Sequence, residues 1–363
     1  MPETMTRREG DDVARALRPW LASRLGQDVD DLNIRAPQGH GFSNDTFFVT
    51  AAAAATRLDV VVQAAPTGAG LFPDYSIERM AAIQRGLRDH SDVPVASVRW
   101  FEGDATVLGA PFYVMDRADG SEPDESPRPY HTAGWVAEAT TAQRRQLWTS
   151  VLDAMARLHR VEVSPHFDHL TGGRWGMAVD ADPAATRVHQ WREYTVWAAD
   201  DDAPTQVLMD AWDHLAASTP PPPPRRSISW GDAKLGNVMF DAFEVVALLD
   251  WELCGISAAE EDLMNWLAVD QVLADVKKTR ADGFLTYDET VAAYADLLQR
   301  DLVGTQWWYA FALAKMGAEV DRILRRSKQL GALPDDLDLV AVNSALPRLR
   351  DALNGLGGDS DAR

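Results

Sequence analysis

The stretch SISWGDAKLGNVMFDAFEVVALLDWE, residues 227–252, sets three oxygen-bearing side chains, Asp232, Asn237 and Asp250, around two short apolar runs. The runs NVMF and VVALLD flank a turn at DAFE, which predicts a β-hairpin with Asn237 beginning one strand and Asp250 ending the other. Pairing of the strands brings these two ends together, and Asp232 lies on the loop just before them. Because Asp and Asn beside Gly also make ordinary turns, the stretch alone leaves a purely structural interpretation open.

The convergence of these three side chains predicts a magnesium site. Hard oxygen ligands without a thiol or imidazole nearby suit Mg2+, which takes few protein ligands and leaves room for phosphate oxygens. An aspartate that does not bind the metal can accept a proton from a substrate hydroxyl. The stretch is therefore compatible with phosphate chemistry as well as with an ordinary turn.

The composition indicates a globular protein with an acidic surface. The chain has 363 residues, 46% of them hydrophobic, which is enough for one large or two medium domains. Its formal net charge of -20 argues against a nucleic-acid partner, because affinity for a phosphate backbone rests on clustered Lys and Arg. The acidity either serves solubility or favours a cationic substrate.

The compartment is predicted to be the cytoplasm. Cys254 is the single cysteine, which excludes an internal disulfide, and no Cys/His cluster has the spacing of a zinc site. The N-terminal residues 1–20 are charged throughout and lack the apolar core of a signal peptide. No apolar run approaches the roughly 18 to 20 residues that span a bilayer, so we expect no membrane partner. Both a monomer and a homodimer fit the sequence.

Hydrophobic periodicity predicts a β-rich first part and a helical second part. We expect an N-terminal helix in residues 1–30, a β-sheet lobe over 31–118, a helical lobe over 119–355 and a flexible tail over 356–363. The proline run Pro220–Pro224 predicts an extended surface connector. Within the first part the patterns predict helices over 11–25 and 76–88, strands over 47–50 and 59–63, and two more strands within 95–102 and 110–120.

WGDAKLGN followed by LLDWE resembles the catalytic loop and metal-binding aspartate of the aminoglycoside phosphotransferase and choline kinase family. The resemblance implies an α+β, protein-kinase-like two-lobed fold. Three further segments match in order: GHGFSNDTFFV resembles the turn that covers the nucleotide, LGAPFYVMDRADG the last strand and hinge of the N-terminal lobe, and ARLHRVEV the helix that ends in Leu-His. The segment WWYAFALAKMGAEVDRIL resembles a late helix of the subgroup related to acyl-CoA-dehydrogenase-fused kinases. The likeness covers roughly residues 30 to 330.

The resemblance assigns roles to residues of the catalytic loop. It implies that Asp232 positions or deprotonates the acceptor hydroxyl, that Asn237 and Asp250 hold Mg2+ against the nucleotide phosphates, and that Lys234 reaches the transferring phosphate. ATP or GTP would be the phosphate donor. The residues that the resemblance assigns to the nucleotide are Ser43, Asn44, Gln63, Asp116, Arg117 and Ala118.

Several positions depart from the family pattern. Trp230 stands where a histidine buttresses the loop, and Gln63 stands where a Lys or Arg contacts the α and β phosphates. A neutral amide donates hydrogen bonds but does not offset phosphate charge. Glu78 is the candidate acidic partner on the following helix, and Asp262 is expected to cap or orient a helix. Lys234 is the cation that could compensate.

The function predicted is Mg-dependent transfer of the γ-phosphate of ATP or GTP to a hydroxyl of a small molecule, such as an aminoglycoside-like or other cationic acceptor. One alternative is a weak or inactive kinase-like protein that binds a nucleotide or another small ligand. A metal-dependent hydrolase would leave the nucleotide turn and hinge unexplained. Most tryptophans are expected to pack the core, Trp251 among them, and a cluster of acids could draw cations to an acceptor pocket: Asp200, Asp201, Asp202, Glu260 and Glu261.

Overall fold

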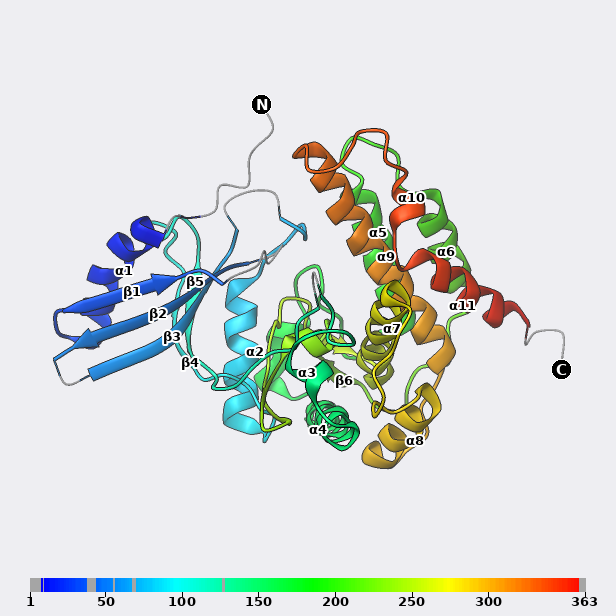
Figure 1. Ribbon diagram of the computed structural model, residues 1–363, viewed down its shortest axis with the longest axis horizontal. Coiled ribbons are helices and arrows are strands. Elements are labelled where there is room, and N and C mark those ends of the chain that lie inside the picture. The colour runs from blue at the N-terminus through cyan, green and yellow to red at the C-terminus, as the bar shows by residue number, and fades with distance from the viewer. Residues whose placement is uncertain are drawn as a thin grey trace. The chain divides into compact units, whose positions relative to one another are not determined.

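The computed structural model describes residues 8, 10–37, 44–54, 56–66, 70–125 and 128–358 (Figure 1). The chain divides into two compact units. The N-terminal unit comprises the chain up to Asp89 together with Ala96–Ala118, and the C-terminal unit comprises His90–Val95 together with the chain from Asp119 onward. Each unit is described by itself below.

The N-terminal unit is built on an antiparallel sheet of five strands in the order β1-β2-β3-β5-β4. Its elements are α1 (Gly10–Leu25), β1 (Asp31–Arg35), β2 (Asp45–Ala53), β3 (Thr56–Ala64), α2 (Ile77–His90), β4 (Val98–Glu102) and β5 (Phe112–Asp116). The predicted strands at 47–50 and 59–63 lie inside β2 and β3. The strand β1, residues DLNIR, was missed because it is short and lies half exposed, so its sequence carries little apolar alternation.

Alternation along the central strands gives this sheet two buried faces. Val60 and Val62 of β3 pack in one core with Leu17 of α1, while Val61 packs in a second core with Met80 of α2. Side chains point to opposite faces at successive strand positions, so an unbroken run of valines serves a strand that is covered on both sides. The helices α1 and α2 therefore cover opposite faces of the sheet.

The C-terminal unit is mainly helical. Its elements are α3 (Gly134–Glu138), α4 (Thr141–Arg160), η1 (Pro165–Leu170), α5 (Pro183–Ala198), α6 (Gln206–Ala217), β6 (Ser227–Ser229), η2 (Leu235–Asn237), β7 (Val238–Asp241), β8 (Glu244–Leu248), β9 (Gly255–Ser257), α7 (Ala259–Lys277), α8 (Tyr287–Leu298), α9 (Thr305–Gln329), α10 (Leu339–Val342) and α11 (Leu346–Gly358). The long helix α9 contacts α5, α6, α7 and α11, as Figure 1 shows. The tail was expected from residue 356, but α11 continues to Gly358, and residues 359–363 lie outside the described part of the chain.

The opening stretch folds as two nested antiparallel pairs. β6 pairs with β9, so that Ser229 lies opposite Gly255, and β7 pairs with β8 inside the loop that this closes. The inner turn places Ala242 and Phe243 at φ of 47° and 67°, the left-handed geometry that suits the twist of a two-residue hairpin turn. The predicted hairpin is confirmed.

The strand limits differ slightly from the prediction. Asn237 belongs to the 3-10 turn η2 just before β7, and Asp250 lies two residues beyond the end of β8. Both therefore stand on irregular backbone at one end of the hairpin, where side chains can be aimed independently of the sheet pleat.

Among the described residues, no helix combines the length and the apolar character needed to cross a bilayer.

The two-sided core of the N-terminal unit can be tested at α1. Leu17 is fully buried, so Leu17→Ala should lower the free energy of unfolding of this unit by about 2–5 kcal/mol through lost burial and a residual cavity. The control is Arg15→Ala on the same helix, whose side chain is 76% exposed and whose loss should change stability by less than about 0.5 kcal/mol. Urea unfolding followed by circular dichroism measures both variants. Equal stabilities of the two would contradict the packing described.

Candidate active site

Asn237 and Asp232 lie in direct contact. The Asn237 amide nitrogen donates to the Asp232 backbone carbonyl at 3.0 Å and to its carboxylate oxygen Oδ2 at 2.9 Å. The amide oxygen of Asn237 therefore points away from Asp232 and is the group that remains to meet a cation.

Asp250 lies next to this pair through a backbone contact. The amide of Leu249 donates to the Asn237 carbonyl at 2.8 Å, which brings the residue before Asp250 against the catalytic loop. Asp250 itself has φ of 59°, a left-handed conformation that aspartate adopts more readily than most residues. Burial, followed by the nearby Asp232 carboxylate, raises the pKa of Asp250 to about 6, although Lys234 acts in the opposite direction. A second positive charge beside Asp250 would relieve this repulsion.

Lys234 carries the positive charge of the loop. Its Nζ lies 3.0 Å from Asp232 Oδ2. Burial works against its charged form, but Asp232, Glu125 and Asp250 outweigh that effect and raise the pKa of Lys234 well above its usual value. Lys234 is therefore a charged, largely buried cation beside the predicted base, which fits the predicted role at a transferring phosphate.

A second lysine, Lys315 of α9, was not predicted. Its Nζ donates to the Gly231 carbonyl and, at 3.1 Å, to Asn265 Oδ1, and it lies 3.9 Å from Asp232 Oδ1. Burial would raise the pKa of Asp232, but Lys234 and Lys315 outweigh it and hold that pKa below its usual value. The available signal was a lone lysine in the apolar run FALAKMGA, because a cation at a core position needs a buried partner.

Glu125 was also missed. Its carboxylate accepts a hydrogen bond from the Gly236 amide at 3.0 Å, inside the catalytic loop. It lies in the polar segment SEPDESPRPYH, whose spacing gives no sign that one of its acids returns to the loop. The pKa of Glu125 is raised, because the effect of burial outweighs the opposite effect of Lys234.

Asp262 anchors the loop and does not cap a helix, which corrects the prediction. It stands inside α7, and the N-cap position of that helix is Ala258. The buried Asp262 carboxylate accepts from the amides of Trp230 at 2.7 Å and Gly231 at 2.8 Å. Two side chains complete its shell, Ser229 Oγ at 3.0 Å and His159 Nε2 at 2.9 Å. His159, expected only to pack, therefore also holds this carboxylate.

The residue Gln63 in the N-terminal unit belongs to a neutral hydrogen-bonded chain. Its amide oxygen accepts from the Tyr113 hydroxyl, and that hydroxyl accepts from Gln84 of α2 at 3.0 Å. Glu78 is exposed in the first turn of α2, so the connection from β3 to α2 passes through Tyr113 and Gln84 and not through Glu78. The resulting link lacks the charges of a lysine–glutamate pair.

The other predicted nucleotide residues are in varied situations. Ser43 lies outside the described residues. Asn44 is buried just before β2, and its amide nitrogen lies 4.0 Å from the Met80 sulfur. The Asp116 amide donates to the Ser97 carbonyl, and the Arg117 amide to the Asp59 carbonyl, so both hinge donors are engaged within the unit. Backbone recognition of a base at this hinge would therefore rest on Ala118 and on carbonyl groups.

The acids expected to form a cation-attracting pocket are mostly neutralised, which corrects that expectation. Arg300 lies 2.6 Å from buried Glu260, and Arg187 lies 3.0 Å from buried Glu261. Asp200 and Asp202 are exposed and form ion pairs with Arg322 and Arg325. Buried carboxylates are stable when paired, so Glu260 and Glu261 serve structure and leave little negative charge for a ligand.

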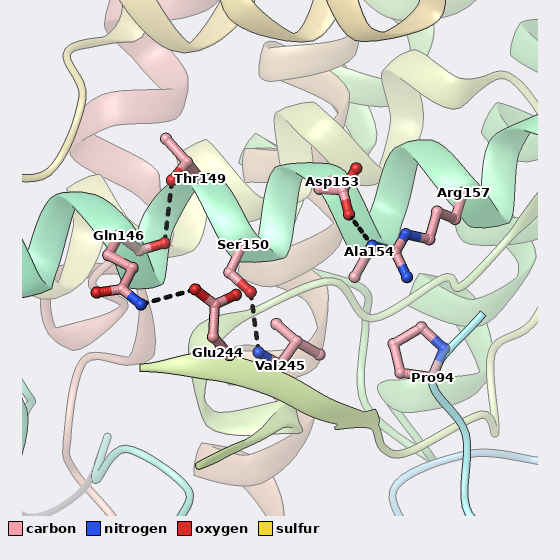
Figure 2. Close-up of a pocket in the computed structure, with 9 residues that line it drawn as sticks. All are labelled: Pro94, Gln146, Thr149, Ser150, Asp153, Ala154, Arg157, Glu244 and Val245. Carbon is pink, nitrogen blue, oxygen red and sulfur yellow. Dashed lines mark hydrogen bonds and ion pairs between the residues drawn. The ribbon is translucent and has the colours of Figure 1, made fainter. Parts of the chain in front are cut away.

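A polar pocket of about 280 Å³ lies between α4 and β8, and Figure 2 shows the residues that line it. Gln146 donates to Glu244 at 2.7 Å, and Ser150 Oγ accepts from the Val245 amide at 2.9 Å, so its contacts hold the hairpin against α4. It is lined by Pro94, Gln146, Thr149, Ser150, Asp153, Ala154, Arg157, Glu244 and Val245. None of Asp232, Asn237 and Asp250 lines it.

The donor set at the hairpin end fits a hard divalent cation. Asp250 supplies a partly buried carboxylate with an elevated pKa, and Asn237 supplies an amide oxygen that points away from its hydrogen-bonded partner. Within the described ranges no group of three or more His, Cys, Asp and Glu side chains is placed to hold a metal ion. A site with two protein ligands suits Mg2+ that is completed by phosphate oxygens and water, and it does not suit zinc.

Fold and site together define a kinase-like phosphotransferase, and the comparisons with known proteins agree. The chain belongs to the phosphotransferase enzyme family, whose sequence model matches residues 35–297. The resemblance expected from WGDAKLGN and LLDWE is thereby confirmed.

Solved structures share the fold. A Ralstonia eutropha protein assigned to the aminoglycoside phosphotransferases is 18% identical, with a TM-score of 0.69 over 95% of this chain and 98% of that one. A spectinomycin phosphotransferase, in complex with ADP and spectinomycin, is 12% identical, with a TM-score of 0.56 over 95% of this chain and 98% of that one. The predicted α+β, protein-kinase-like fold is confirmed.

A curated relative links the chain to the predicted subgroup. Acyl-CoA dehydrogenase family member 11 of Mus musculus is 28% identical over 256 residues, which is 69% of this chain and 30% of that protein. The chain spans less than a third of the length of the curated relatives it matches.

The role of Asp262 can be tested by its pH dependence. Asp262→Asn replaces an acceptor oxygen by a donor that faces backbone amides, so it should cost about 3–5 kcal/mol of stability at pH 7. Burial would raise the pKa of Asp262, but the bonds from His159 and then from the backbone amides hold it below the ordinary 3.8. A carboxyl whose pKa is lower in the folded than in the unfolded protein stabilises the fold at any pH above its unfolded-state pKa. This stabilisation is lost as the pH falls through its folded-state pKa.

The free energies of unfolding of wild type and Asp262→Asn should therefore approach each other progressively as the pH falls below about 4. Urea unfolding at a series of pH values measures this difference. Asp213→Asn, at an exposed position, is the control and should change little at any pH. A difference between wild type and Asp262→Asn that does not shrink in acid would contradict the anchoring role.

Proposed function

We propose that the protein transfers the γ-phosphate of a nucleoside triphosphate, ATP or GTP, to a hydroxyl group of a small molecule. The observation that carries this proposal is the contact between Asp232 and Asn237 at the hairpin end beside Asp250, with Lys234 3.0 Å from Asp232. Family membership supports the reaction class, and the residue roles below follow from the contacts.

Asp232 is the acceptor-orienting group. Lys234 and Lys315 hold its pKa low, so it is a carboxylate at neutral pH and can accept a hydrogen bond from the acceptor hydroxyl. A strongly ionised aspartate is a weak base, and its main contribution is therefore to align the hydroxyl for in-line attack. The hydroxyl oxygen forms the new bond to phosphorus, the bond to the nucleoside diphosphate breaks, and the proton leaves through Asp232 to solvent.

Lys234 supplies positive charge where the transferring phosphate would lie. In this chain it has particular weight, because Gln63 brings no charge to the nucleotide. Lys315, being buried against Gly231 and Asn265, holds the loop that carries Asp232 and is not available to a substrate.

Asn237 and Asp250 would hold Mg2+ through the amide oxygen and the carboxylate. When bound, Mg2+ offsets the charge of the nucleotide phosphates and orients them. Such a cation would stabilise the ionised form of Asp250, because burial and the Asp232 carboxylate both disfavour that form.

The proposed nucleotide contacts are Asn44, Gln63 and the segment from Asp116 to Ala118. Ser43 is also proposed as a nucleotide contact, on the basis of the sequence alone. Gln63 can donate hydrogen bonds from its amide nitrogen, because its oxygen is engaged by Tyr113. At the hinge, Ala118 is the proposed backbone contact, since the amides of Asp116 and Arg117 are engaged.

The acceptor is proposed to be a small hydroxyl compound. The net charge of -20 favours a cationic acceptor by long-range attraction, although the paired acids near α5, α7 and α9 make no dedicated anionic pocket. A screen should therefore include amino alcohols, aminoglycosides and uncharged polyols.

A second candidate function is nucleotide or ligand binding without efficient transfer. The neutral chain from Gln63 through Tyr113 to Gln84 favours it, because it replaces the charged pair that the family uses at the phosphates. Retention of Asp232, Asn237 and Asp250 favours the enzyme, since a binding module does not need an acceptor-orienting carboxylate.

Calorimetric titration of ATP and GTP with and without Mg2+ tests the proposal. Wild type should bind a nucleotide more tightly with Mg2+, and Asp250→Ala should lose that difference. Asp241→Asn, at an exposed position of the same hairpin, is the control and should bind like wild type. Nucleotide binding that does not respond to Mg2+ in wild type would contradict the metal role.

Asp232→Asn separates the enzyme from the binding protein. With an acceptor found in the screen, this substitution should lower kcat by about 10²- to 10⁴-fold, while nucleotide affinity stays within about threefold. Measurement of phosphate transfer decides the matter: nucleotide binding without transfer to any acceptor would favour the second candidate.

A further inference from the structure

We propose that Trp230, which stands where the family has a histidine, is a positioning residue for Asp250. Its indole holds the peptide before Asp250 and thereby fixes the carboxylate in the direction from which it meets Mg2+. This inference rests on the proposed function for its metal and on the contacts below for its geometry.

Two tryptophans bond the two carbonyls that precede Asp250. Trp230 Nε1 donates to the Leu249 carbonyl at 2.6 Å, and Trp251 Nε1 donates to the Leu248 carbonyl at 3.0 Å. The two indole rings lie with centroids 6.2 Å apart at an interplanar angle of 39°. We call Trp230 and Trp251 the indole clamp.

The amides of the same two residues are also engaged. Leu248 donates to the Pro94 carbonyl at 2.8 Å, and Leu249 donates to the Asn237 carbonyl at 2.8 Å. Both N–H and both C=O groups ahead of Asp250 therefore have partners, which leaves the backbone of Leu248 and Leu249 little freedom to rotate.

This restraint matters because Asp250 has a backbone conformation that non-glycine residues rarely adopt. Its φ of 59° is unfavourable for an L-residue, and such geometry persists where neighbouring contacts impose it. Without the bond from Trp230, the Leu249–Asp250 peptide is freer to rotate toward a commoner conformation, which would change the direction of the Asp250 carboxylate.

Trp230 is itself held from the opposite side. Its side chain is fully buried, and its amide donates to Asp262 of α7. The next residue, Gly231, has φ of 87° and lies so close to Leu253 that a Cβ would stand 2.2 Å from the Leu253 carbonyl oxygen. A connected path thus runs from Asp262 through Trp230 and Leu249 to Asp250.

The hydrogen bond, and not only the size of the ring, is the part that we assign to positioning. Trp230→Phe keeps an aromatic ring and removes the N–H donor, leaving the partly buried Leu249 carbonyl without that partner. The matched control is Trp307→Phe: its indole is also buried and donates to the Leu215 carbonyl at 3.1 Å, but it belongs to the start of α9, where its ring packs against Trp308 and Phe311.

Two measurements test the inference. Hydrogen–deuterium exchange of the ligand-free protein should show faster exchange in residues 248–252 for Trp230→Phe and no change there for Trp307→Phe. Calorimetry with Mg2+ and ATP or GTP should show that Trp230→Phe weakens the Mg2+-dependent part of nucleotide affinity about tenfold, while affinity without Mg2+ is unchanged.

The possible outcomes distinguish a failure of this inference from a failure of the proposed Mg2+-dependent phosphotransferase function. If Trp230→Phe matches Trp307→Phe in exchange at 248–252, the indole only packs and the inference is overturned. If wild type shows no Mg2+-dependent binding, the proposed function fails, while the exchange data still decide whether the clamp holds the peptide. If Trp230→Phe is insoluble, Trp251→Phe replaces it, with faster exchange at 248–252 supporting the clamp and unchanged exchange overturning it.

Discussion

The buried carboxylate of Asp262 is the contact on which the catalytic loop depends. It accepts hydrogen bonds from the amides of Trp230 and Gly231 and from the side chains of Ser229 and His159. These donors come from two separate segments of the chain, α4 and residues 229–231, so one carboxylate ties α4 and the loop to α7. A buried charge is tolerated only when it is fully satisfied, and here the satisfaction is what gives the loop a single conformation.

Charge balance then explains the composition of the site. Asp232 and Asp250 are two partly buried acids close enough to affect each other, and Lys234 and Lys315 offset their negative charge. The cations act mainly on Asp232, and Asp250 keeps an elevated pKa. The asymmetry separates two residues of one type: Asp232 is held as a stable carboxylate, and the charged form of Asp250 would be favoured by a further cation.

Much of the site was predictable because its residues are close in sequence. The hairpin brings Asp232, Asn237 and Asp250 together through local pairing, and the turn at Ala242 and Phe243 forms as the apolar runs indicate. Lys315 and Glu125 were not predictable in this way, since each reaches the loop from about 80 or more residues away. Asp262 was noticed but assigned to a helix cap, because nothing in its sequence shows which amides it would meet.

The sequence by itself determined the family, the fold and the hairpin that carries Asn237 and Asp250, because these depend on short-range spacing and on the order of motifs along the chain. Only the tertiary structure decided how charges are paired. It showed that Glu260 and Glu261 are neutralised by Arg300 and Arg187, that Gln63 bonds Tyr113, and that Trp230 reaches the Leu249 carbonyl. Electrostatic and hydrogen-bonding partners are set by distance in space, and residue order constrains that distance only within a local element.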